Sequence, residues 1–102
     1  MNIRDSEKYI KARIEYGVKR GRQLSIQNFG TAERGCALTM CLPPRMAAPV
    51  NVRGFITRTL GWSDAEFWHF ATGYDIGTAS FTAHHRLGNR IRLWAIEKGY
   101  LL

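Results

Sequence analysis

The residues best suited to chemistry in this chain are two cysteines and two adjacent histidines. Cys36 and Cys41 are separated by four residues, and His84 and His85 lie much further along the chain. Thiolates and imidazoles bind zinc, but structural zinc sites usually contain closely spaced ligand pairs at both ends. Neighbouring residues of a helix also point about 100° apart, so one site would rarely use both histidines. We therefore expect no metal site, and we expect two reduced, mostly buried thiols instead.

A cysteine nucleophile is the other chemistry that these residue types allow. Cys36 would lie in the N-terminal half of an expected helix, where a thiol pKa can fall. His69, His84 and His85 are the available bases, but nothing in the sequence orders them, and no glycine-rich oxyanion loop accompanies the cysteine. We therefore predict no catalytic residue, no cofactor and no enzyme. A Cys/His-dependent enzyme remains the second alternative.

The strongest signal in the sequence is its charge. Fifteen Lys and Arg residues oppose eight Asp and Glu residues, which gives the 102 residues a formal net charge of +7. Such an excess raises the local concentration of any anionic partner. The chain therefore fits a small basic protein that docks on an anionic macromolecule.

Two groups of cations stand out, one at the expected end of the first helix and one on the last helix. Arg86 and Arg90 are one helical turn apart, on the side away from the expected core. Leu93 lies on the same outer side, and an exposed apolar residue beside arginines is typical of a protein contact. The predicted partner-binding residues are Lys19, Arg20, Arg22, Arg86, Arg90, Arg92 and Leu93.

We favour a non-catalytic binding or regulatory function, in which these residues dock on nucleic acid or on a nucleic-acid-associated complex. The alternative is an inhibitor or adaptor, of phage or mobile-element origin, that binds an acidic protein surface. Residues 53–72 have the outline of a helix-turn-helix motif. Their second helix is acidic and aromatic around Glu66 and Phe67, however, which fits a core-facing helix better than one that reads bases.

The composition indicates a folded domain. Hydrophobic residues make up 45% and aromatic residues 12% of the chain, which is too much for a disordered protein. The length fits a single helical domain over residues 1–102. No apolar run approaches the roughly 18–20 residues of a membrane span, and the N-terminus is too charged for a signal peptide. We therefore expect a cytoplasmic protein without a membrane partner.

Helical periodicity dominates, and we predict an all-α, compact domain of about five short helices. Ile10 and Ile14 lie on one face of a first helix that opens near Asp5 or Ser6 and closes at Gly21. Prolines 43 and 44 should end a second helix. The other expected elements are a short strand or loop over 23–30, that second helix over 31–41, a connector over 43–50, and a third helix over 51–60.

The clearest local signal surrounds a fourth helix, expected over 64–72. Ser63 and Glu66 form a capping box, and Trp62 and Phe67 have the spacing of a hydrophobic staple. Gly73 should end this helix in a left-handed conformation. The last helix is expected from Ser80 to Lys98, with His85 pointing outward and with a buried stripe of Phe81, His84, Leu87, Gly88, Ile91, Trp94 and Ala95.

Three fragments together resemble a group of small bacterial proteins of no known activity. The fragments are Gly35-Cys36-Ala37-Leu38, then Leu60-Gly61, then Gly73-Tyr74-Asp75 followed by Leu87-Gly88. The group shows a Gly-Cys-Pro-Leu-Gly-like segment, a Gly-Phe-Asp-like turn and a terminal helix with Leu-Gly. This chain has Ala37, Thr39 and Tyr74 where the group has proline, glycine and phenylalanine. The resemblance covers residues 33–92 and implies a compact helical domain without implying an activity.

Overall fold

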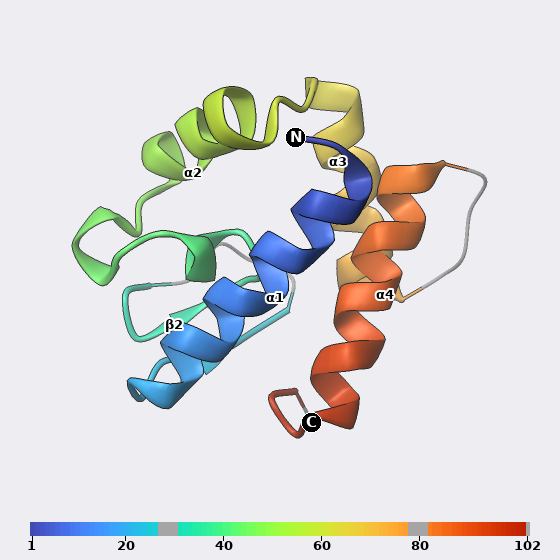
Figure 1. Ribbon diagram of the computed structural model, residues 1–102. Coiled ribbons are helices and arrows are strands. Elements are labelled where there is room, and N and C mark those ends of the chain that lie inside the picture. Colours follow the sequence, from blue (N-terminus) through green and yellow to red (C-terminus); the bar gives the residue numbers. More distant parts are fainter. Residues whose placement is uncertain (27–30, 78–81, 102) are drawn as a thin grey trace.

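The computed structural model describes residues 1–26, 31–77 and 82–101, and most of these residues are helical (Figure 1). The expected all-α fold is confirmed, and the radius of gyration of 12.1 Å is close to the ~13 Å of a compact domain of about 100 residues. No helix in the described part of the chain is long and apolar enough to cross a membrane. The α-helices of these ranges are α1 (Ile3–Lys19), α2 (Pro49–Phe55), α3 (Asp64–Ile76) and α4 (Ala83–Glu97).

Local capping decides where α1 begins. The side chain of Asn2 accepts a hydrogen bond from the backbone N–H of Asp5 over 2.8 Å, so the helix starts slightly earlier than expected. The buried face carries Ile10 and Ile14, as their four-residue spacing predicts. Gly21 adopts a left-handed conformation with a φ of +86°, and the chain turns there as expected.

Helices α3 and α4 pack against each other and run in the same direction (Figure 1). His84, near the start of α4, lies 3.5 Å from Glu66, near the start of α3. Further along both helices, Arg92 donates a hydrogen bond to the carbonyl oxygen of Tyr74 over 2.9 Å. The contacts advance together along the two helices, so the pair is parallel.

Two glycines allow α3 and α4 to approach closely. A Cβ atom at Gly73 would collide with the backbone carbonyl of His85, and one at Gly88 would collide with the backbone carbonyl of Phe70. Gly73 is therefore an interior residue of α3, and the expectation that it ends the helix is wrong. The left-handed residue that follows α3 is Gly77, with a φ of +75°.

The start of α3 is as expected from the sequence. The backbone N–H of Glu66 donates to the Ser63 hydroxyl over 3.2 Å, and the backbone N–H of Ser63 donates to the Glu66 carboxylate over 2.8 Å. This capping box satisfies two backbone donors that the helix itself leaves free. Trp62, just before the cap, is buried with its ring centroid 5.1 Å from that of Phe70.

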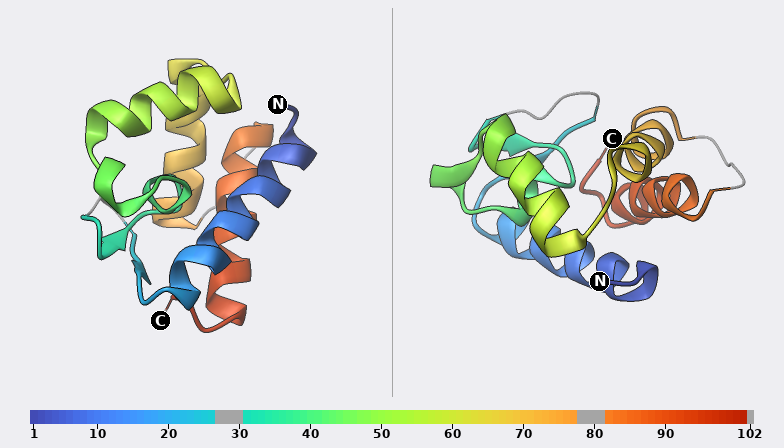
Figure 2. Two further views of the ribbon diagram at one scale, coloured as in Figure 1. Left: turned by 60° about the vertical axis from the view of Figure 1, so that its left-hand side comes forward. Right: turned by 90° about the horizontal axis from the view of Figure 1, so that it is seen from above.

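Helix α1 lies alongside α4, also in the same direction (Figures 1 and 2). Arg90 donates to the carboxylate of Glu7 over 2.9 Å, and beyond the end of α4 the Tyr100 hydroxyl lies 3.4 Å from the carboxylate of Glu15. The helices α1, α3 and α4 therefore share one direction. Figure 2 shows α2 lying across the ends at which α1 and α3 begin.

The segment between α1 and α2 is mostly non-helical. Strand β1 (Gln23–Leu24) pairs in parallel with β2 (Arg34–Gly35), and two 3₁₀ turns follow, η1 (Thr39–Cys41) and η2 (Pro44–Met46). The expected helix over 31–41 is wrong, because backbone groups of this stretch bond to β1 and to the side chain of Arg22 instead. For residues 23–30 the sequence left a short strand and a loop open; Gln23 and Leu24 form the strand β1, and residues 27–30 lie outside the described chain.

Helix α2 begins earlier than the expected cap at Asn51. Its first residue is Pro49, whose fixed φ suits the first turn of a helix. The helix continues through the π-helical turn η3 (Ile56–Leu60) and ends at Gly61, which has a φ of +70°. Tyr9 of α1 stacks on Phe55 with 5.9 Å between the ring centroids, so α2 closes over the start of α1.

The buried face of α4 differs in part from the expected one. His85 is buried and His84 is only partly buried, which reverses the expectation, because the close approach of α3 covers the His85 side of the helix. Trp94 is partly buried. The expected start at Ser80 and the expected core residue Phe81 lie outside the described residues. The other expected core positions are confirmed as buried, namely Leu87, Gly88, Ile91 and Ala95.

Candidate functional site

Arg22, one of the predicted partner-binding residues, is a buried structural residue. Its side chain is only 8% exposed. Its Nε donates to the carbonyl oxygen of Ala32 over 2.8 Å, and its Nη1 donates to that of Leu42 over 2.7 Å. The carbonyl oxygen of Thr39 accepts a third, longer hydrogen bond from Nη2. The prediction that Arg22 belongs to an exposed basic surface is therefore wrong.

Two of the predicted arginines on α4 also have partners within the protein. Arg90 donates through Nε and Nη2 to the Glu7 carboxylate, over 3.1 and 2.9 Å. Arg92 donates to the carbonyl oxygens of Tyr74 and Asp75, both over 2.9 Å, and so satisfies free carbonyls in the last turn of α3. Arg86 is exposed in the first half of α4. These contacts reduce the charge that α4 offers to a partner.

The remaining predicted cations lie at the far end of α1. Lys19 and Arg20 are exposed, and the Arg20 guanidinium lies over the ring of Tyr16, 3.6 Å from its centroid. Lys19 follows Glu7 by twelve residues, or about 18 Å along a helix. Because Glu7 marks the position of Arg90, the two predicted groups of cations are well separated.

The predicted apolar contact on α4 is exposed. Leu93 is 56% exposed and Ile96 is 42% exposed, on the outer side of the helix. Tyr100, beyond the end of α4, packs its ring edge-on against Trp94, with 5.5 Å between centroids. Two large apolar side chains therefore remain accessible beside Arg90.

A basic stretch that the sequence reasoning missed runs through β2, η2, α2 and η3. Residues 34–63 contain Arg34, Arg45, Arg53 and Arg58 and no Asp or Glu. All four arginines are exposed. Within the described ranges, none of the side chains of Arg45, Arg53 and Arg58 forms an ion pair or a hydrogen bond. The sequence indicates this stretch as a run of 30 residues without an acidic residue. The spacing of its arginines, however, does not place them on one face of a helix.

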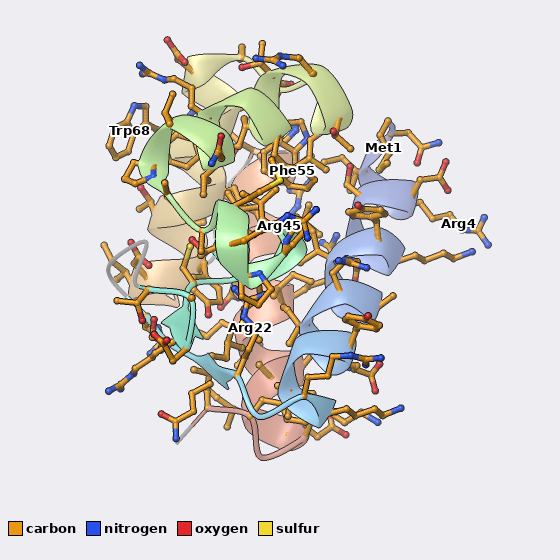
Figure 3. All side chains as sticks on the ribbon, turned by 90° about the vertical axis from the view of Figure 1, so that its left-hand side faces the viewer. Met1, Arg4, Arg22, Arg45, Phe55 and Trp68 are labelled. Carbon is orange, nitrogen blue, oxygen red and sulfur yellow. The ribbon has the colours of Figure 1, made fainter. Side chains whose placement is uncertain are left out.

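A groove lies between α2 with η3 on one side and α3 on the other. Its volume is about 320 Å³. Trp68 of α3 is 65% exposed and Val50 of α2 is 75% exposed, and Figure 3 shows Trp68 projecting from the edge of the molecule beside α2. The groove carries two charged groups, Arg53 and Asp64. The full lining is Pro49, Val50, Arg53, Ile56, Thr57, Asp64, Phe67 and Trp68.

The thiols and imidazoles do not gather into a site. Cys41 is buried, its thiol lies 3.4 Å from the carbonyl oxygen of Ala37, and burial raises its pKa far above the usual range of a thiol. Cys36 is partly buried, with its sulfur 3.4 Å from the Thr39 hydroxyl. Among the described residues, no three His, Cys, Asp or Glu side chains are grouped so that they could hold a metal ion. A buried thiol with a raised pKa is unsuited to act as a nucleophile.

Comparison with known proteins returned no family model, no curated protein and no solved structure that matches this sequence significantly.

Proposed function

We propose that this protein is a non-catalytic binding domain that docks on nucleic acid through three exposed arginines of residues 34–63, Arg45, Arg53 and Arg58. The observation that carries the proposal is that Arg45, Arg53 and Arg58 have no acidic partner in the described chain. By contrast, Arg90 is neutralised by Glu7. A guanidinium without an internal partner keeps its forked donors available for a phosphate group.

Nucleic acid fits this stretch better than an isolated anionic site would. The arginines are spread along consecutive elements instead of converging on one point, and a phosphate backbone presents charges at regular intervals. Trp68 offers an exposed aromatic surface at the groove that Arg53 lines. Cations that track a backbone, combined with an aromatic side chain, are the usual combination in proteins that bind single strands.

The salt dependence of binding tests this proposal. A fluorescein-labelled single strand of about 20 nucleotides would be titrated with the protein at several KCl concentrations, and the affinity followed by anisotropy. Each phosphate neutralised should contribute a slope of about −0.7 to a plot of log K against log salt, so three arginines should give about −2. Absence of binding at low salt, or an affinity that does not change with salt, would refute the proposal.

A second candidate, an acidic protein partner, is favoured by a different face. Leu93 and Ile96 are exposed on α4 next to Arg90. Exposed apolar side chains bordered by arginine are common in protein interfaces. If a partner protein binds there, Leu93→Asp should weaken the complex as strongly as Arg90→Glu, and moderate salt should have a smaller effect than on a nucleic-acid complex.

A further inference from the structure

We infer that the groove between α2 and α3 accommodates one unpaired base of a single-stranded nucleic acid, stacked on Trp68. This inference rests on the proposed function and deepens it, because it names the form of nucleic acid and the residue that distinguishes a single strand from a duplex.

The first argument is the exposure of Trp68. A tryptophan has the largest apolar surface of any side chain, yet this one is 65% exposed, whereas Trp62 is 5% exposed. Phe67 lies beside it, with 5.0 Å between the ring centroids and 57° between the ring planes. Phe67 is partly buried and is a wall of the same groove. The Trp68 indole is therefore supported from one side and open to a ligand, which is the arrangement of a stacking platform.

The second argument is the size of the groove. A volume of about 320 Å³ is at the lower end of the range for small-molecule sites, roughly 300–1,000 Å³. A base within a duplex reaches such a groove only after it is unpaired and unstacked, which disfavours binding of the duplex. The groove therefore fits a single flat group from a single strand.

The third argument is the pair of charges in the groove. Arg53 offers donors to a phosphate, while Asp64 offers only an acceptor. An acidic peptide would bring carboxylates next to Asp64 and would be repelled. A nucleotide carries an anionic phosphate together with an amino group on cytosine, adenine or guanine, and a carboxylate accepts a hydrogen bond from such an amino group. Both charges of the groove thus find a complementary group in one nucleotide.

Fluorescence of the full-length protein tests the inference. The probe is an oligodeoxycytidine strand of about 20 nucleotides, compared with the same strand annealed to its complement. The single strand should quench tryptophan emission, and the Trp68→Phe variant should lose that quenching. The Trp94→Phe variant should retain it, because Trp94 lies on α4 against Lys11 and Tyr100, away from the groove.

Affinity gives a second readout on the same probe. Trp68→Ala should weaken binding of the single strand about five-fold or more, which is the usual loss when a stacked aromatic is removed. Ile76→Ala is the matched control, since it removes an exposed apolar side chain of α3 that does not line the groove, and it should leave affinity unchanged. Urea unfolding of both variants checks that they fold, which their exposure predicts.

The outcomes separate this inference from the proposed function. Salt-dependent binding without quenching, and with wild-type affinity in Trp68→Ala, would overturn the stacking site and leave the proposed function intact. Equal quenching and affinity with the duplex would also overturn it. Equal quenching by a polyglutamate peptide would assign the groove to an acidic protein and overturn it. If neither the single strand nor the duplex binds, both the stacking site and the proposed nucleic-acid function are refuted.

Discussion

The Nη1 of Arg22 donates to the carbonyl oxygen of Leu42 over 2.7 Å, inside the protein. Through this contact, and through hydrogen bonds to Ala32 and Thr39, one guanidinium holds together the loop that follows α1. The residue that the sequence placed on a binding surface is therefore a connector between the helical part of the chain and its non-helical part.

Replacing Arg22 should destabilise the fold strongly. In Arg22→Met, the carbonyl oxygens that accept from the guanidinium lose a charged donor while they remain buried, and each such loss costs about 1–3 kcal/mol. We expect the free energy of unfolding to fall by about 3 kcal/mol or more in urea titrations. The exposed Arg45→Met, whose side chain forms no ion pair or hydrogen bond within the described ranges, should change it by less than about 0.5 kcal/mol. Equal effects of the two variants would contradict the structural role.

The close contact between α3 and α4 should not tolerate added methyl groups. In Gly73→Ala and Gly88→Ala, the new Cβ would collide with a backbone carbonyl of the facing helix, so the helices must separate. Such overpacking typically costs about 1–3 kcal/mol, which a lower thermal midpoint would reveal. Gly54→Ala is the matched control, because a Cβ there meets only the flexible end of Arg58 at 3.3 Å. The free energy of unfolding of that control should rise by up to about 1 kcal/mol, since alanine favours a helix more than glycine does. A midpoint at or above that of the wild type in Gly73→Ala would contradict the packing.

Stability should fall in mildly acidic solution because of His84. Burial lowers the pKa of His84 from its ordinary value of 6.5 and outweighs the opposing effect of Glu66. The unfolded chain then binds the proton more readily than the folded chain. The neutral His84 therefore contributes to the free energy of unfolding above pH 6.5, and this contribution is lost as the pH falls below that value. The urea midpoint should therefore be lower at about pH 5.5 than at about pH 7.5. In His84→Gln, the difference between the urea midpoints at the two pH values should be smaller than in the wild type. In His69→Gln, at an exposed position, most of that difference should remain. An unchanged difference in His84→Gln would refute this assignment.

The features that the sequence predicted correctly are local ones. The capping box of Ser63 and Glu66 lies within four residues, and its hydrogen bonds depend on little beyond the helix start itself. The buried face of α1 follows from the spacing of Ile10 and Ile14 in the same way. Such patterns are determined by side chains that are neighbours in the chain, so they can be predicted without knowledge of the tertiary structure.

The features that the sequence did not predict depend on contacts between distant residues. In the sequence alone, Gly73 is typical of a residue that ends a helix. Its actual role, to allow the close approach of α4, is visible only when the two helices are packed together. The helical face that carries Arg90 was assigned correctly, but the carboxylate of Glu7 that neutralises it lies 83 residues away. The exposed arginines of residues 34–63 were overlooked because they follow no helical period, and their lack of partners is a tertiary property.

The measurement that tests the central claim most directly is a comparison of two variants that lose the same charge. One is Arg45→Gln/Arg53→Gln/Arg58→Gln, and the control is Lys19→Gln/Arg20→Gln/Lys98→Gln, whose side chains are also exposed. In salt titrations with a labelled single strand, the first variant should lose about 2 from the slope of log K against log salt, and the control should keep the slope of the wild type. An equal loss in both variants, or a larger loss in the control, would contradict the assignment of the binding surface to residues 34–63.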